Sequence, residues 1–435
     1  MSRRVVRWLS ACVAGMLLLT QQALNASAGV TPFDPGECHV AAKGTAAPQT
    51  SWHFQRLQMD RVWKVATGRG VTVAVIDTGV STTGSLYMQA AADKRFTAYD
   101  LLDGRKSDGN QQLDEFDCLH GTRVTSLLAA GRGSDGKPID GRVEFSGIAP
   151  DAKVLTYRSL MQSEVQEDSE PMPLQPTTEA VLDAVARKVD VINLSQVVPE
   201  TVEGFEGLRD AIQLAINRGI VVVAAAGNNG QMQGMRAFPA SFPGVISVGA
   251  TNRNDAASSV SQAGAKVDVG APGEGIVALD PSHHDSVRGV ESQVYSPPIA
   301  GTSFATPIVS GVVALMIEKQ RDDGLAPLTP AEVRQRLIET ADPPPAAVPD
   351  PALGAGIVNP LRVLSGEVPQ LAPNEQADTT VLPKHYPPEA HVDSRPAVIG
   401  IVMGIVAVML VVAGIVATLV IPAARRVSRE DRGRA

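Results

Sequence analysis

Cysteine and basic side chains are scarce in this chain of 435 residues. Its three cysteines exclude a disulfide-dense scaffold and a four-cysteine zinc site. Lysine and arginine number 38 against 46 aspartate and glutamate, so no basic surplus exists to neutralise phosphates, which argues against a nucleic-acid-binding protein. Charged residues make up 19% and aromatic residues 4%, which excludes a disordered polyelectrolyte and a coiled coil. The length allows two or three domains, or one large domain with additional segments.

Long apolar stretches occur at both ends of the chain. Three arginines among the first seven residues precede a mostly apolar stretch at 9–19, and a small-residue cleavage pattern ends at Ala28. This order predicts a secretory signal peptide over residues 1–28, with a short buried helix as the alternative.

Residues 397–421 carry no charged side chain. At about 1.5 Å per residue, a helix of this length is longer than the roughly 30 Å core of a bilayer. Five arginines follow within 422–435, and positive flanks stay in the cytoplasm. The sequence therefore predicts a single transmembrane helix with a cytoplasmic tail, which places the preceding residues outside the cytoplasm. A buried core helix is the alternative.

The segment between these ends divides into three parts. Residues 29–51 form a short, poorly patterned extension, and residues 52–364 carry alternating strand and helix patterns. Residues 365–396 contain six prolines without periodicity, which is typical of a semi-rigid linker that extends by about 3.1 Å per residue.

Within residues 52–364, the nearly continuous apolar run at 71–76 predicts a strand that is buried on both faces. Further strands are predicted at 153–158, 189–195, 219–226 and 245–249. Helical patterns lie at 178–188, 205–217 and 302–320, and a capping box predicts a helix from Pro330. Strands separated by helices predict an α/β fold with a mostly parallel central sheet.

Four polar residues lie in small-residue motifs that suit tight backbone turns: Asp77, His120, Asn228 and Ser303. Each alone has a structural explanation, namely a strand-end turn, a core histidine, a turn and a helix cap. Together they support nucleophilic catalysis, because a serine hydroxyl becomes reactive when a neighbouring base takes its proton.

The expected mechanism gives each residue one task. His120 takes the proton of Ser303 and returns it to the leaving amine, while Asp77 fixes the imidazole tautomer. Asn228 and backbone N–H groups at a helix start stabilise the oxyanion. The mechanism needs no cofactor and no metal. Residues 103–117 hold five acidic side chains, but a solvated loop is favoured there over a calcium site.

These motifs resemble those of the subtilisin-like serine proteases, the subtilases. Asp77-Thr-Gly, His120-Gly-Thr and Gly-Thr-Ser303-Phe-Ala-Thr-Pro occur in the order of that family. The resemblance covers residues 52–364. It implies a catalytic domain with a subtilisin-like three-layer fold, a serine endopeptidase activity on proteins or peptides, a triad formed by these three residues, and Asn228 as oxyanion donor.

A closer likeness is to the mycosins, the membrane-anchored subtilases of actinobacterial type VII secretion systems. Phe304 after the serine, a cysteine two positions before His120, a proline-rich tether and one C-terminal helix are similar to theirs. The resemblance implies membrane components of such a system as partners, and a catalytic domain on the outer side of the cell membrane. The alternatives are a structural component of the secretion complex, or an envelope protease without a secretion partner.

Removal of the signal peptide leaves two cysteines, Cys38 and Cys118. An even number in an oxidising compartment suggests a disulfide, with two buried thiols as the alternative. Mycosins have similar cysteines. A bond between them would make residues 29–51 a permanent brace of the catalytic domain rather than a removable inhibitor.

One segment departs from the subtilase pattern. Gln196 and Val197 follow Ser195 where many subtilases have Leu-Gly. Because the corresponding family strand lines the specificity pockets, no substrate preference is carried over to this chain.

Overall fold

The structure is a computed structural model. It describes residues 31–33, 51–82, 85–89, 95–102, 118–133, 145–160, 173–228, 236–263, 266–285, 290–345 and 348–366. All of these belong to the first of the two units into which the chain divides, Met1–Pro369. The segments expected to be the signal peptide, the transmembrane helix and the basic tail lie outside the described residues, as do Cys38, the loop at 103–117 and almost all of the linker. Among the described helices, none combines the length and the apolar character needed to cross a bilayer.

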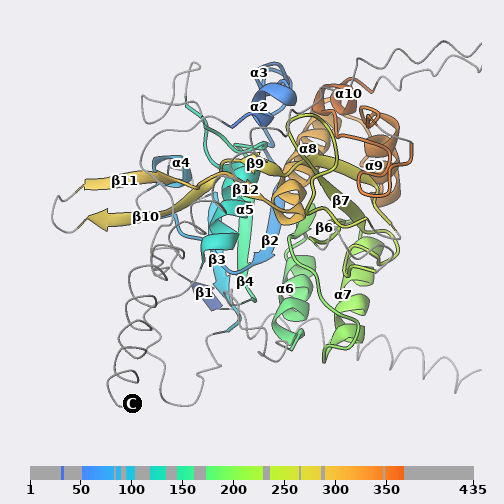
Figure 1. Ribbon diagram of the computed structural model, residues 1–435. Helices are drawn as coiled ribbons and strands as arrows, with labels where there is room; N and C mark the ends of the chain where they lie inside the picture. The colour runs from blue at the N-terminus through green and yellow to red at the C-terminus, as the bar shows by residue number, and fades with distance from the viewer. Residues whose placement is uncertain are drawn as a thin grey trace, which may run out of the picture. The chain divides into compact units, whose positions relative to one another are not determined.

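A mostly parallel sheet forms the centre of the described structure (Figure 1). Seven neighbouring strands run parallel, and β1 pairs antiparallel at one edge. In spatial order the strands are β1 (Thr31–Phe33), β3 (Phe96–Asp100), β4 (Lys153–Arg158), β2 (Thr72–Asp77), β5 (Val191–Leu194), β6 (Val221–Ala225), β7 (Ile246–Thr251) and β8 (Val269–Pro272). The predicted parallel α/β sheet is confirmed, and the structure adds β1, β3 and β8 to the five predicted strands.

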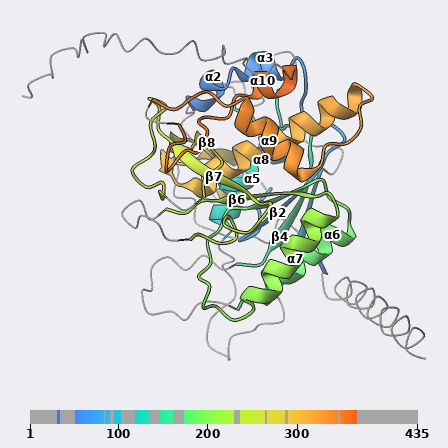
Figure 2. The same ribbon diagram turned by 90° about the vertical axis from the view of Figure 1, so that its right-hand side faces the viewer.

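Helices cover both faces of the sheet, with α6 and α7 on one side and α8 on the other (Figure 2). The helices are α2 (His53–Arg56), α3 (Met59–Val62), α4 (Leu86–Gln89), α5 (Leu119–Ala129), α6 (Gln175–Ala186), α7 (Phe205–Asn217), α8 (Thr302–Asp322), α9 (Pro330–Glu339) and α10 (Pro360–Ser365). The predicted bounds of α7 are confirmed. The capping box also forms, since the Thr329 hydroxyl accepts the Glu332 N–H and the Glu332 carboxylate accepts the Thr329 N–H.

Alternation along the strands divides the core into two layers. In β2, Val73 and Val75 pack in the cluster that contains α8, whereas Ala74 and Ile76 pack in the cluster that contains α6 and α7. Both faces of the strand are therefore apolar, which explains why its sequence reads as a continuous apolar run.

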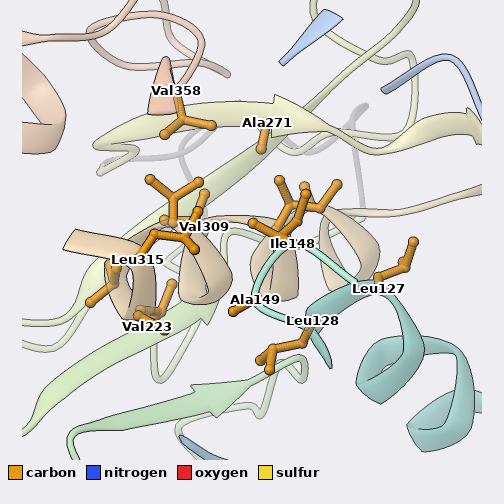
Figure 3. Packing of buried hydrophobic residues seen from close by; sticks show 14 of the residues in the cluster. Leu127, Leu128, Ile148, Ala149, Val223, Ala271, Val309, Leu315 and Val358 are labelled. Atoms are coloured by element: carbon orange, nitrogen blue, oxygen red, sulfur yellow. The ribbon is translucent and has the colours of Figure 1, made fainter. Parts of the chain in front are cut away.

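Helix α8 runs through the larger core, where Val309 and Leu315 lie among buried side chains of β6 and of the segment at 145–149 (Figure 3). Gly311 permits this packing, because a Cβ there would lie 2.6 Å from the Cβ of Ile148. The Ser310 hydroxyl donates to Asn193 Oδ1 of β5 at 2.8 Å, which fixes the third turn of the helix against the sheet.

Two small antiparallel pairs complete the described elements, β9 (Glu274–Ile276) with β12 (Ile299–Ala300), and β10 (Leu279–Asp285) with β11 (Val290–Tyr295). Arg123 of α5 donates two hydrogen bonds to the carboxylate of Asp280 in β10, at 2.7 and 3.1 Å. This bidentate ion pair joins α5 to β10.

Candidate active site

Asp77 is the last residue of β2 and is 1% exposed. It lies at the carboxyl edge of the parallel sheet, where open α/β folds bind their ligands. Its Oδ1 accepts a hydrogen bond from the Thr78 N–H at 2.7 Å and lies 2.8 Å from Nδ1 of His120. The carboxylate is therefore held by its own turn and directed at the imidazole.

His120 lies in the first turn of α5, and two glycines allow that turn to approach the end of β2. A Cβ at Gly121 would lie 2.0 Å from the carbonyl oxygen of Gly79, and Gly79 itself has φ +98°. Thr78 stabilises this contact between α5 and the end of β2, because its Oγ1 accepts the Gly121 N–H at 3.0 Å. The Asp-Thr-Gly and His-Gly-Thr motifs thus form one interlocked turn that holds the carboxylate against the imidazole.

Ser303 is the second residue of α8 and is 7% exposed. A Cβ at Gly301 would lie 3.1 Å from Ser303 Oγ and 3.4 Å from Nδ2 of Asn228. The hydroxyl and the amide nitrogen therefore border the same small space, which a side chain at position 301 would fill. The backbone is held by Ser195, whose hydroxyl donates to the Ser303 carbonyl oxygen at 2.8 Å.

Asn228 follows β6 at the same edge of the sheet, and two hydrogen bonds orient its side chain. Its Oδ1 accepts from the N–H of Thr302 at 2.7 Å and from the Thr302 hydroxyl at 2.9 Å. Because the oxygen faces Thr302, the amide nitrogen is the atom directed toward the space beside Ser303. The Thr302 hydroxyl also accepts the Gly227 N–H at 3.1 Å, so this one side chain joins α8 to the turn after β6.

Residues 68–364 match the family model of the subtilase family. The chain belongs to this family. It is therefore a serine protease, and the expected subtilisin-like α/β fold is confirmed.

Mycosins are among its similar relatives. The chain is 32% identical over 363 residues to Mycosin-1 of Mycobacterium tuberculosis, with 75% of each chain covered. It is 32% identical to Mycosin-4 of the same organism, covering 76% of this chain and 72% of the relative. The crystal structure of MycP1 from Mycobacterium smegmatis has a TM-score of 0.57 and 28% identity, and it covers 79% of this chain and 94% of its own. The chain is thus a mycosin-like member of the subtilases.

The structure brings the four predicted site residues of this subtilase to one edge of the sheet. Asp77 and His120 share a hydrogen bond, and Ser303 and Asn228 border one space. The imidazole centroid lies 5.3 Å from the ring centroid of Phe304, the residue after the serine, so the histidine lies against the first turn of α8. The assignment of catalytic roles to these residues stays a prediction.

The sequence motifs contain two threonines for which no role was predicted. Thr78 links β2 to α5, and Thr302 links α8 to Asn228. A threonine beside each reactive residue was the available signal, because its hydroxyl both donates and accepts.

Cys118 immediately precedes α5, is fully buried and is disulfide-bonded. Because Cys38 lies outside the described residues, the pairing of these two cysteines stays a prediction. Within the described residues, no group of three or more acidic, histidine or cysteine side chains could hold a metal ion. The acidic segment at 103–117 lies outside the described residues.

Proposed function

We propose that this chain is a membrane-anchored endopeptidase of a type VII secretion system that cleaves peptide bonds through an acyl-enzyme on Ser303. The hydrogen bond between Asp77 and His120, formed beside the helix turn that carries Ser303, is the observation that supports this proposal most directly. It connects residues that are far apart in the sequence in the arrangement that activates a serine hydroxyl.

Each step of the reaction uses a group at this edge of the sheet. His120 takes the Ser303 proton while Oγ attacks the peptide carbonyl carbon, and Asp77 stabilises the imidazolium that forms. The negative charge on the carbonyl oxygen is stabilised by Nδ2 of Asn228 and by the positive end of α8. His120 then protonates the leaving amine, and water releases the acyl group by the same steps in reverse.

The secretion role is supported by the names of similar proteins and by the ends of the sequence. One similar solved structure is described as MycP3 protease from the type VII (ESX-3) secretion system, and another, MycP1, as an essential component of the ESX-1 system. In this chain, a signal peptide at 1–28 would export the protease domain. A transmembrane helix at 397–421 would then hold the domain at the outer surface of the cell membrane, beside the secretion channel.

Labelling with a fluorophosphonate probe tests the chemistry. The wild-type protein should label on Ser303, Ser303→Ala should not label, and His120→Ala should label far more slowly because the hydroxyl lacks its base. A wild-type protein that does not label, or a Ser303→Ala variant that labels normally, would contradict the proposal.

A structural role in the secretion complex is the second candidate, and it is favoured by the description of MycP1 as an essential component. Complementation of a deletion strain with Ser303→Ala separates the two. Restored secretion supports the structural role, whereas lost secretion supports proteolysis. Purification of the full chain in detergent adds a third outcome, because an isolated monomer would indicate an envelope protease without a secretion partner.

A further inference from the structure

The carbonyl oxygen of Ser303 lacks the hydrogen bond that an α-helix normally provides. In a helix, the N–H of each residue donates to the carbonyl oxygen four residues earlier. For Ser303 the residue in that donor position is Pro307, which lies inside α8 and has no N–H. The peptide group that follows Ser303 therefore needs a donor from outside its own helix, because an unpaired buried carbonyl is unfavourable.

Strand β5 is the part of the sheet from which this donor comes. Ser195 immediately follows β5 and is 5% exposed, and its hydroxyl donates to the Ser303 carbonyl oxygen at 2.8 Å. The carbonyl is thus bonded to the sheet rather than to the next turn of α8. Asp77 ends the neighbouring strand β2, so the same sheet positions both the carboxylate and the serine of the proposed triad.

A buried asparagine in β5 orients the Ser195 hydroxyl. Asn193 is fully buried, and its neighbours across the sheet are Val75 and Val223, both in the apolar cluster that contains α8. Its Nδ2 donates to Ser195 Oγ at 3.0 Å, and its Oδ1 accepts the Ser310 hydroxyl of α8 at 2.8 Å. Packing alone favours an apolar residue at this position, because an amide buried among valines needs both bonds to offset its lost hydration.

The hydrogen bonds through β5 all run in one direction. Ser310 donates to Asn193, and Asn193 donates to Ser195. Because the Ser195 oxygen accepts the amide hydrogen, its own proton points away from Asn193 and toward the Ser303 carbonyl oxygen. The first and the third turn of α8 are thereby both bonded to the same strand.

We propose that Ser195 and Asn193 are positioning residues for Ser303. The Ser195 hydroxyl takes the place of the helix bond that Pro307 removes, and Asn193 keeps that hydroxyl in the donating orientation. Loss of either side chain frees the peptide group after Ser303 and lets the first turn of α8 move, which displaces Oγ from the His120 imidazole. A misplacement of about 1 Å can slow a reaction about a hundredfold. The inference rests on the proposed peptidase function and adds two residues to the site that performs it.

The second-order rate constant of fluorophosphonate labelling tests the position of Ser303 Oγ. Ser195→Ala should lower this constant about tenfold or more, and Ser195→Thr, which keeps the hydroxyl, should retain most of it. Peptide hydrolysis should show the loss in kcat with KM nearly unchanged, because the substrate-binding surface is intact. Ser247→Ala is the matched control, since that buried hydroxyl at the start of β7 donates to the Lys266 carbonyl oxygen, and its constant should equal that of the wild type.

Pro307→Ala provides a sharper test, because alanine restores an N–H that can donate to the Ser303 carbonyl oxygen. In this background the loss caused by Ser195→Ala or by Asn193→Leu should shrink from about tenfold to about threefold or less. The comparison uses rate constants rather than the final extent of labelling, so a partly unfolded preparation does not imitate the effect. Equal losses with and without Pro307, or an unchanged constant in Ser195→Ala, would overturn the inference.

A carbonyl NMR measurement separates this inference from the proposed function. The sequence contains two Ser-Phe pairs, at 241–242 and 303–304, so ¹³C-carbonyl serine combined with ¹⁵N phenylalanine marks two peptide bonds in the full chain in detergent. Ser195→Ala should shift the Ser303 carbonyl signal and leave the Ser241 signal in place. Such a shift supports the inference even if the wild-type protein hydrolyses nothing, in which case only the proposed function fails. An unchanged Ser303 signal would overturn the inference.

Discussion

His53 shows how burial alone can make stability depend on pH. The imidazole is fully buried, its Nδ1 lies 2.6 Å from the Ser51 hydroxyl, and its Nε2 has no partner in the structure. Burial disfavours the charged form and lowers the pKa of His53 from 6.5 to about 3. Between these values the unfolded chain binds the proton and the folded chain does not.

Stability is therefore fully present above pH 6.5 and decreases as the pH falls from 6.5 toward 3. The contribution of His53 is about 1.4 kcal/mol of unfolding free energy for each pH unit in that window. We expect His53→Asn, which keeps a polar group near Ser51 but does not titrate, to show a shallower loss. Urea unfolding at pH 7, 6 and 5 measures both slopes, and equal slopes in the two proteins would contradict the assignment.

Thr302 is expected to act as a positioning residue for the oxyanion donor. Thr302→Val keeps the shape of the side chain but removes the hydroxyl that donates to Asn228 Oδ1 and accepts from Gly227. Because the Thr302 N–H still holds Asn228, kcat should fall by less than in Asn228→Ala, for which we expect a loss of about 10²–10³-fold, as when one oxyanion donor is removed from a subtilisin.

The split between kcat and KM distinguishes positioning from general damage. Thr302→Val should lower kcat and leave KM nearly unchanged, since the oxyanion forms only during the reaction. Thr340→Val is the control, because that buried threonine bonds to a carbonyl in α9, away from the site. An unchanged kcat in Thr302→Val, or an equal loss of kcat in Thr340→Val, would show that Thr302 does not position the oxyanion donor.

At the scale of elements, helix α5 lies in close contact with the turn that follows β2. A Cβ at Gly121 would lie 2.0 Å from the Gly79 carbonyl oxygen, so Gly121→Ala must displace the helix that carries His120. We expect a loss of about 1–3 kcal/mol in stability and a large loss of fluorophosphonate labelling. Gly207→Ala in α7 is the matched control, because its Cβ would meet only Thr178 Cγ2 at 3.9 Å, and alanine favours helices by up to about 1 kcal/mol. Normal labelling in Gly121→Ala would show that α5 can move without loss of the site.

The sequence predicted an element well where the element is buried on both faces or carries a clear local pattern. Strands β2 and β6 are covered on both faces, so their apolar runs predicted them directly. Strand β3 mixes threonine, tyrosine and aspartate with apolar residues, because its outer neighbour is only the short β1. Its pairing depends on partners distant in sequence, and no local pattern encodes that.

The site was predictable for a related reason. The motifs that carry the four predicted site residues also contain small residues, which permit the close approach of α5 and α8 to the sheet. The same motifs therefore indicate both the reactive side chains and the backbone contacts that bring them together. These residues are Asp77, His120, Asn228 and Ser303. The roles of Thr78 and Thr302 were not predictable, because their hydrogen bonds to Gly121 and Asn228 form only once the strands and helices are in place.

For the whole molecule, the disulfide of Cys118 is expected to couple the N-terminal extension to the site. Cys118 lies two residues before His120, and the predicted bond to Cys38 closes a loop of about 81 residues, worth roughly 4.5 kcal/mol in the chain-entropy model. Reduction should therefore lower the melting temperature and slow fluorophosphonate labelling. Cys38→Ser should melt like the reduced wild-type protein and should not respond to reductant. A Cys38→Ser variant that still responds to reductant would show that Cys118 has another partner, and the extension would then be free to leave the catalytic domain.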